Sequence, residues 1–150
     1  MKKKSKILLF HYSKSKGARI LLGLRKISEH ESYWWLPGGS VEGTEKGLEA
    51  GFRELQEELE LDAGSLSTIN SYLLNNIYIP NVTYFTDVSE NTLYFIDIGP
   101  LFEEPVFPIK DEFVDIKWFS TKQLPSNMSR EFPLVDNFFS EKWLKSISQL

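Results

Sequence analysis

A glycine-rich loop that leads straight into an acidic segment constrains this chain more than any other feature of its sequence. Residues 37–39 read Pro-Gly-Gly and Gly43 follows, which is typical of a turn-rich approach to a helix N-terminus. Thr44 is a suitable N-cap, and Glu45 suits the positive end of the helix dipole in the first turn. Because glycine has no Cβ, this backbone can approach a ligand closely. The segment therefore predicts a loop and then a helix beside a binding site.

The predicted helix carries three carboxylates on one face. Each residue of an α-helix advances the helical wheel by about 100°. With Glu54 at 0°, Glu57 falls at about 300° and Glu58 at about 40°, so the three share an arc of about 100°. An apolar face lies well away from them, made of Leu48, Phe52, Leu55 and Leu59. Arg53 flanks the acidic face, from which it could hold a carboxylate by a bidentate hydrogen bond.

Crowded carboxylates repel one another unless a cation lies between them. A run of acids usually marks a solvated face of a surface helix, but a glycine loop next to three aligned carboxylates is a rarer combination. Hard divalent cations such as Mg²⁺ prefer oxygen ligands and often hold substrate phosphates as well. The segment therefore predicts a metal-dependent enzyme that acts on a phosphorylated small molecule.

These residues resemble the Nudix (MutT-like) box, which reads G-x5-E-x7-R-E-U-x-E-E-x-G-U, where U is a bulky aliphatic residue. Gly39, Glu45, the run Arg53–Leu55 and the pair Glu57–Glu58 stand at the positions that the box specifies. One position departs from the pattern, since Glu60 stands where the box has its second glycine. The number of matching positions makes a chance resemblance improbable.

The departure at Glu60 bears on where the helix ends. A glycine at this position would end the helix in a left-handed conformation. A glutamate in that conformation costs ~1 kcal/mol or more. We therefore expect the helix to run on to Asp62 or Ala63 and to stop at Gly64, with the acidic face unaffected.

The rest of the chain alternates strand-like and helical patterns. Lys6–Tyr12 and Arg19–Arg25 read as strands joined by a short turn and predict a hairpin, whereas Lys2–Lys4 read as a frayed terminus. A helix is expected over Glu131–Gln149, from its apolar stripe. Further strands are expected at 33–36, 66–79, 81–87, 91–98 and 113–119, with one helical turn at 121–124.

The resemblance extends beyond the box and implies a fold. Ala18–Lys26 is similar to the family's early strand, and Asp111–Pro125 is similar to its late strand and the turn after it. Helices that flank a mixed sheet fit an α/β/α sandwich. The expected fold is thus a Nudix-type α/β/α sandwich with a mixed β-sheet, with residues 1–150 forming one domain.

The resemblance also implies roles for individual residues. Arg53 and Glu45 would orient the carboxylates, and a further carboxylate outside the box is expected, with Glu112 the best match and Asp111 the second. The expected catalytic residues are Arg53, Glu54, Glu57 and Glu112. The expected metal ligands are the backbone carbonyl of Gly39 and the side chains of Glu54, Glu57, Glu58 and Glu112. The expected cofactor is Mg²⁺, with Mn²⁺ as a substitute.

Composition excludes several other classes of protein. A chain of 150 residues can form one domain with a full core, and it has no cysteine and only two histidines, which argues against disulfides and zinc sites. Residues 42–62 hold eight acids and two bases, so the acidity is local and the rest of the chain carries a small positive charge. We expect no binding to nucleic-acid polymers, no membrane segment and a cytoplasmic location.

The sequence leaves the substrate open within a nucleotide class. The first expectation is a pyrophosphohydrolase of nucleoside triphosphates, including damaged ones, and the alternatives are dinucleoside polyphosphates or nucleotide sugars. A non-catalytic Nudix domain that senses a nucleotide is a further alternative function, and a purely structural acidic helix is another. For the assembly, a homodimer is the expected alternative to a monomer. The aromatic residues that could stack on a base are also candidates for the core: Trp34, Trp35, Tyr78, Tyr84 and Phe85.

Overall fold

A mixed sheet of seven strands is the framework of the protein. The computed structural model describes residues 1–59, 64, 67, 71, 75, 78–99, 104–109 and 112–148. Within these residues the strands are β1 (Lys2–Ser13), β2 (Gly17–Ser28), β3 (Glu31–Trp35), β4 (Gly38–Ser40), β5 (Asn81–Phe85), β6 (Ser89–Asp97) and β7 (Asp115–Ser120). The helical elements are α1 (Gly47–Glu58), the 3₁₀ helices η1 (Phe132–Leu134) and η2 (Asp136–Phe139), and α3 (Glu141–Ile147).

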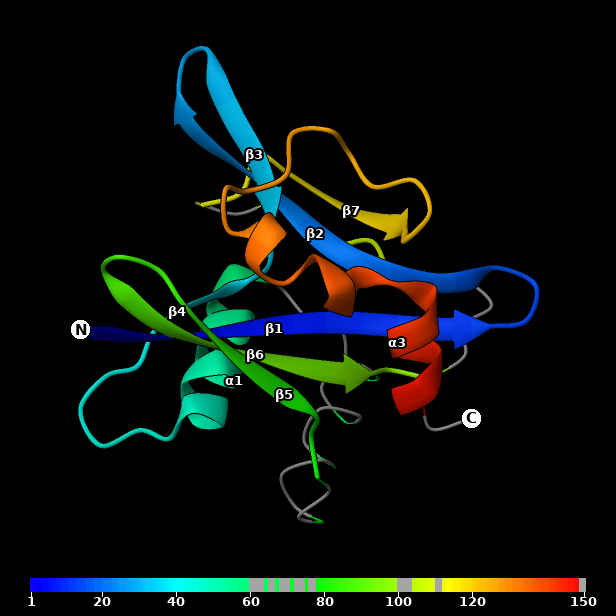
Figure 1. The fold of residues 1–150 in the computed structure, drawn as a ribbon, viewed down its shortest axis with the longest axis horizontal. Helices are drawn as coiled ribbons and strands as arrows, with labels where there is room; N and C mark the ends of the chain where they lie inside the picture. Colours follow the sequence, from blue (N-terminus) through cyan, green and yellow to red (C-terminus); the bar gives the residue numbers. More distant parts are fainter. Residues whose placement is uncertain are drawn as a thin grey trace.

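The strands follow the order β3-β2-β1-β6-β5, with β4 paired to β1 and β7 paired to β2 (Figure 1). β1 and β6 run parallel over their whole common length, and the other pairs are antiparallel. β1 and β2 form the predicted hairpin, which is confirmed, but they pair only from Phe10 to Ser13 on β1. Nearer the N-terminus β1 pairs with β4 instead, from Lys4 to Lys6, while β2 pairs with β3. The two central strands therefore diverge at this end.

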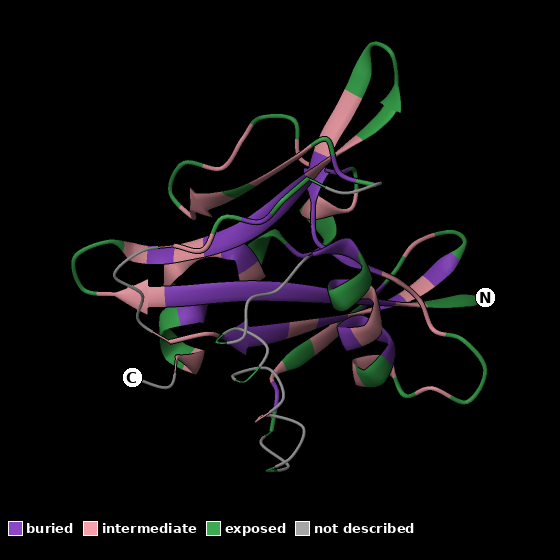
Figure 2. Ribbon diagram, turned by 180° about the vertical axis from the view of Figure 1, so that it is seen from behind, coloured by how far each residue is buried: buried purple, intermediate pink, exposed green. Residues whose placement is uncertain are grey.

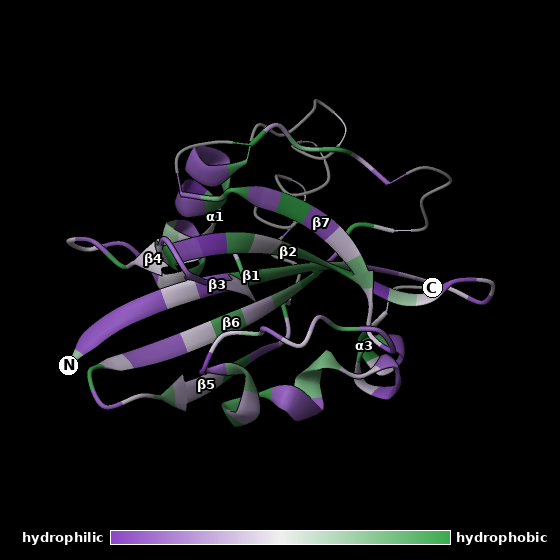
Figure 3. Ribbon diagram, turned by 90° about the horizontal axis from the view of Figure 1, so that it is seen from above, coloured by the Kyte–Doolittle hydropathy of each residue, from purple (hydrophilic) through white to green (hydrophobic). Residues whose placement is uncertain are grey.

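Helical elements cover both faces of the sheet, which confirms the expected α/β/α sandwich. Viewed from above, α1 lies on one side of the sheet and α3 on the other (Figure 3). Alternate residues of β1 supply the two cores: Ile7 and Leu9 pack toward Leu55 of α1, and Leu8 and Phe10 pack in the cluster that holds Phe139 and Leu144. The central stretch of β1 is buried on both faces (Figure 2).

No helix within the described part of the chain is long and apolar enough to cross a membrane.

The two ends of the chain differ from the sequence-based expectation. Lys2–Lys4 belong to β1 rather than to a frayed terminus, because β6 provides a parallel partner that begins at Ser89 opposite Lys2. The single helix predicted over Glu131–Gln149 is wrong, since η1, η2 and α3 occupy that segment. Ser140 has an extended backbone and accepts a hydrogen bond from Trp143 N at 3.2 Å, so it caps a new helix instead of continuing an old one.

Two further predictions fail for local reasons. Residues 121–124 form a turn, closed by a hydrogen bond from Gln123 N to Ser120 O at 3.0 Å, rather than a helical turn. The strand expected over 66–79 lies mostly outside the described residues, and Ser67 and Ser71 within it are helical.

The ends of α1 also differ from expectation. Its N-cap is Lys46 rather than Thr44, because Glu45 N donates to Glu42 O at 3.0 Å and folds the residues before the helix into a separate turn. The helix ends at Glu58, and Leu59 is extended, so the predicted continuation to Asp62 or Ala63 is wrong. Glu60 lies outside the described residues.

We predict that α1 is held to the sheet chiefly by its buried apolar face. Leu55 is fully buried between α1 and the sheet, so Leu55→Ala should lower the free energy of unfolding by about 2–5 kcal/mol. Gln56→Ala, at the next and exposed position, should change it by less than about 0.5 kcal/mol. Urea denaturation of the two variants tests this, and equal effects would contradict the assigned helix face.

Candidate metal and nucleotide site

The three carboxylates of α1 share one face, as predicted, but they lie in three different environments. Glu57 is 59% exposed and Glu58 only 4% exposed, with Glu54 between these extremes. Two arginines hold them. Arg53 contacts Glu54 and Glu57, and Arg25 contacts Glu58. Charge repulsion along the helix is therefore offset within the metal-free protein by two guanidinium groups.

Arg53 joins the helix to the glycine loop. Its Nε and Nη2 donate to the two carboxylate oxygens of Glu45 at 2.8 and 3.1 Å, which is the bidentate contact that the sequence suggested. Nη2 also donates to Ser40 O at 3.0 Å, and Nη1 donates to Glu54 at 3.0 Å. Glu45 accepts a further bond from Glu42 N. The Arg53 hydrogen bonds hold the pKa of Glu45 below its ordinary value, so Glu45 stays ionised.

Arg25 makes a second bridge, which the sequence did not reveal. Its Nη2 donates to Glu58 Oε2 at 3.1 Å, and its Nη1 donates to Glu112 Oε2 at 2.6 Å. Phe113 lies beneath the guanidinium, 4.5 Å from its carbon to the ring centroid. The partners are 33 and 87 residues away along the chain, so no local spacing could predict the bridge. It places Glu112 close to α1, whereas Asp111 lies outside the described residues.

Glu58 is the most unusual carboxylate of the group. Burial raises its pKa to about 7, although Arg25 and the hydrogen bond from Gly38 N oppose that rise. Gly38 N donates to Glu58 Oε1 at 3.3 Å, so the loop contacts the C-terminal end of the helix. A carboxylate that is buried this deeply is poorly solvated as an anion and gains from a nearby cation.

Gly39 lies directly against Glu54. A Cβ on residue 39 would come within 2.5 Å of Glu54 Cδ and 2.6 Å of one of its oxygens, so a larger residue would require the Glu54 carboxylate to move. Among the described residues, no group of three or more acidic or histidine side chains is arranged to hold a metal ion as it stands, and arginines pair with the acids. The donor set is nevertheless all oxygen, which suits a hard divalent cation. The close approach of Gly39 to Glu54 fits the same ion.

A cleft of about 350 Å³ opens where β1 and β2 diverge. Acidic residues line it together with three cations, Lys4, Lys6 and Arg25. The acids and the backbone of the loop complete the wall: Gly38, Gly39, Ser40, Glu42, Glu54, Glu112 and Glu131. A cleft with both signs of charge can hold an anionic ligand beside a metal ion.

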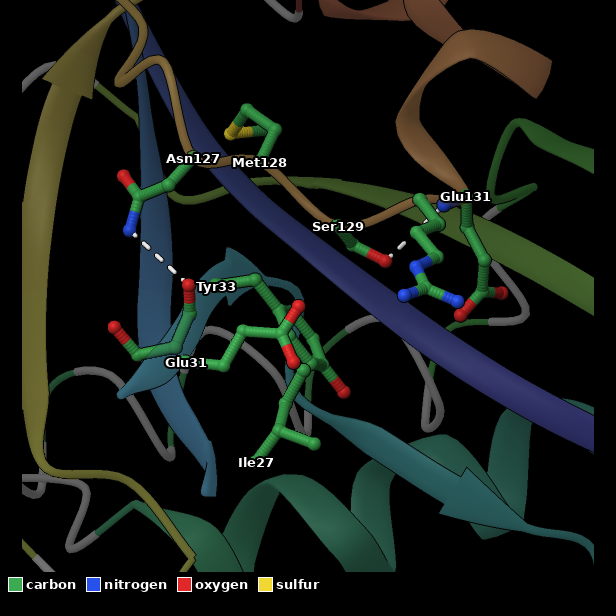
Figure 4. Close-up of a pocket in the computed structure, with 9 residues that line it drawn as sticks. Ile27, Glu31, Tyr33, Asn127, Met128, Ser129 and Glu131 are labelled. Carbon is green, nitrogen blue, oxygen red and sulfur yellow. Dashed lines mark hydrogen bonds between the residues drawn. The ribbon is translucent and has the colours of Figure 1, made fainter. Parts of the chain in front are cut away.

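A second cavity of about 550 Å³ shares Tyr33 and Glu131 with the cleft. Tyr33 comes from β3, and the facing wall comes from the segment after β7, which carries Asn127 and Met128 (Figure 4). Asn127 Nδ2 donates to Ser32 O at 3.3 Å and ties this segment to β3. By its lining residues, the second cavity is less charged than the cleft, and it offers an aromatic ring and a thioether.

The aromatic residues proposed for base stacking fall into two groups. Trp34 and Trp35 are buried, and Trp35 stacks on Phe139 with ring centroids 5.6 Å apart, so both belong to the core, although Trp35 also lines the cleft. Tyr84 is also buried and donates to Glu131 at 2.7 Å. Tyr78 and Phe85 are exposed, and neither lines the two cavities. Tyr33, which the sequence interpretation did not single out, is the aromatic ring common to both cavities.

The matching family confirms what the box suggested. The chain matches the NUDIX domain over residues 4–138, which is most of its length. The chain belongs to the Nudix hydrolase family.

Solved structures of Nudix proteins share this fold at low sequence identity. A MutT/nudix family protein from Enterococcus faecalis is 23% identical, with a TM-score of 0.57 over 79% of this chain and 43% of its own. An Ap4A hydrolase from C. elegans is 14% identical, with a TM-score of 0.56 over 81% and 82%.

A bifunctional NMN adenylyltransferase/ADP ribose pyrophosphatase from Francisella tularensis, complexed with AMP and a Mn ion, is 20% identical. Its TM-score is 0.66 over 95% of this chain and 42% of its own. The chain thus spans less than half the length of the Enterococcus and Francisella proteins. These likenesses establish the fold.

We predict a pH dependence from Glu58 in the metal-free protein. Its folded-state pKa of about 7 exceeds the 4.5 of an unperturbed glutamate, so the folded state binds more protons between these values. The free energy of unfolding should therefore fall as the pH rises through this range. Glu58→Gln should remove that slope and stabilise the metal-free protein by about 2 kcal/mol above about pH 8.

Thermal or urea unfolding across this pH range in EDTA measures the slope. Glu57→Gln is the matched control on the exposed part of the same face and should keep it. A slope that persists unchanged in Glu58→Gln would show that another group titrates.

Proposed function

We propose that this Nudix hydrolase is a divalent-metal-dependent pyrophosphohydrolase that cleaves a nucleoside diphosphate linked to another group. The observation that carries the proposal is the meeting of Gly39 with the carboxylate face of α1, at a cleft that also holds three cations. Acids alone would repel a polyphosphate, and cations alone would not activate water. The two together suit a substrate that arrives with its metal.

The box residues would hold the ion. The ligands we propose are the side chains of Glu54, Glu57 and Glu58 and the backbone carbonyl of Gly39, with Mg²⁺ as the natural ion and Mn²⁺ as a substitute. Such an ion neutralises diphosphate oxygens and lowers the pKa of a bound water. Arg53 keeps the carboxylates oriented through its bonds to Glu45 and Glu54, and it fixes the loop through Ser40 O.

Glu112 supplies the carboxylate outside the box. Arg25 brings it to the wall of the cleft that Glu54 also lines, where it can accept a proton from the attacking water or orient that water. We assign Glu54, Glu57 and Arg53 to the catalytic set with it. Glu54 is the next candidate for the base if Glu112 does not serve.

The two connected cavities support a nucleotide as substrate. The diphosphate would occupy the charged cleft, and the nucleoside would extend past Tyr33 and Glu131 into the second cavity. We propose nucleoside triphosphates, including damaged ones, as the first substrate class, in the cytoplasm where such nucleotides are found. Tyr78, one of the aromatic residues considered for base stacking, lines neither cavity.

Dinucleoside polyphosphates remain the second candidate, because the fold is shared with an Ap4A hydrolase. Nucleotide sugars are a third. A sensor without catalysis is less well supported, since this chain keeps every box carboxylate. A screen of these substrates with Mg²⁺ or Mn²⁺, read as phosphate or pyrophosphate release, tests the proposal. Failure to hydrolyse any nucleotide with either ion would overturn it.

We predict that Glu57→Gln abolishes most hydrolysis while the protein still folds. Glu57 is exposed, so the change removes one proposed metal ligand without disturbing the core, and it relieves some repulsion on α1. Glu49→Gln, an exposed acid at the start of the same helix, is the control and should keep full activity. Steady-state rates with Mg²⁺ and melting curves separate the two effects. A folded, fully active Glu57→Gln protein would contradict the assignment of Glu57 as a metal ligand needed for hydrolysis.

We predict that Glu112→Gln lowers kcat much more than it raises KM. The proposed role acts on water in the transition state, and an interaction of that kind is lost from kcat and kcat/KM together. Asp111→Asn should do much less. Full kinetic curves for both variants decide the matter, and greater sensitivity at Asp111 would transfer the role to that residue.

A further inference from the structure

A lysine side chain lies buried in the cleft without a counter-ion among the residues that the structure describes. Lys6 on β1 is only 7% exposed and lines the cleft with Arg25 and Glu54. Its ammonium group makes no hydrogen bond or ion pair with any of the residues that the structure describes. A buried ammonium without a partner is costly, so its retention calls for a ligand that compensates it.

The glycine loop holds the stem of Lys6. Lys6 pairs with Gly38 in the β1–β4 ladder, and a Cβ on residue 38 would come within 3.0 Å of Lys6 Cδ. The aliphatic part is thus packed against the loop that also contacts Glu58. This packing leaves little freedom to the side chain and fixes the ammonium near the metal end of the cleft.

Glu131 and Glu58, the two acids that act on Lys6, are both engaged elsewhere. Glu131 accepts a hydrogen bond from the Tyr84 hydroxyl at 2.7 Å, and Arg25 donates hydrogen bonds to both Glu58 and Glu112. Burial lowers the pKa of Lys6 most strongly. Glu131 and Glu58 raise it, whereas Arg25 and Lys4 lower it. Glu131 and Glu58 are therefore close enough to raise the pKa of the Lys6 ammonium, but neither forms an ion pair with it.

Lys6 lines the cleft together with Glu54 of the metal face and with Glu131. Glu58 belongs to the metal face, and Glu131 lines both the cleft and the second cavity. A nucleotide that spans the two cavities has to pass this point with the phosphate that carries its sugar. The oxygens of that phosphate are the acceptors that an unpaired ammonium matches best.

We propose that Lys6 Nζ binds the phosphate group attached to the nucleoside of the substrate. This inference rests on the proposed function and adds a binding residue outside the Nudix box. Because a phosphate is common to all nucleotides, Lys6 should contribute equally whichever base is present.

The test is an NMR titration of the metal-free protein with AMP and GMP and with the nucleosides adenosine and guanosine. Lys6→Met, which keeps the length of the stem, should weaken both monophosphates by about tenfold or more and leave both nucleosides unchanged. Lys6→Arg should recover part of the loss. Lys3→Met is the matched control on the same strand, because Lys3 is exposed and pairs with Glu90, and it should change nothing.

The possible outcomes separate this inference from the proposed function. Loss for one base only would make Lys6 a base contact, and equal loss for nucleosides and monophosphates would make it a structural residue; either result overturns the proposal, as does no loss at all. Removal of an unpaired buried charge should leave the melting temperature of Lys6→Met equal or higher, so misfolding is monitored directly. If the wild-type protein hydrolyses nucleotides while Lys6→Met matches it in kcat/KM, only the present inference fails.

Discussion

The guanidinium of Arg53 is the point on which the site depends. It joins three parts of the chain: the glycine loop through Ser40 O, the turn before the helix through Glu45, and the acidic face through Glu54. Without a cation in this position, the carboxylates on one arc of α1 would repel each other. One delocalised charge with five donors can satisfy all of these partners at once, which a lysine could not do.

The divergence of β1 and β2 opens the cleft beside this helix. Strands that stayed paired along their whole length would close the sheet and leave no cleft. Here β1 exchanges β2 for β4, and the cleft opens at the exchange. The same change brings Lys4 and Lys6 to the edge of the cleft, while the next residues of β1 continue as core. One strand thus supplies both the cations of the site and the centre of the sandwich.

Two arginines of different origin balance the acids. Arg53 lies on the helix itself, within four residues of Glu54 and Glu57, whereas Arg25 reaches Glu58 and Glu112 from β2. Burial of Glu58 keeps its pKa high even with Arg25 beside it. Guanidinium groups and the raised pKa of Glu58 thus offset part of the acidic charge of the site.

The sequence by itself determined the parts that depend on near neighbours. Helical spacing placed Glu54, Glu57 and Glu58 on one face and put Arg53 beside them, and the resemblance to the Nudix box singled out Gly39. Strand alternation and the short turn at Gly17 predicted the first hairpin. The sequence-based prediction of one helix after residue 130 was wrong, because Ser140 and the 3₁₀ turns interrupt an apolar stripe whose spacing alone favours a single helix. Only the tertiary structure decided which acid is buried, that Arg25 links Glu58 to Glu112, that Lys6 is left without a counter-ion among the described residues, and that Tyr33 borders both cavities. These features depend on contacts between strands and loops that are distant along the chain, and local periodicity carries no information about them.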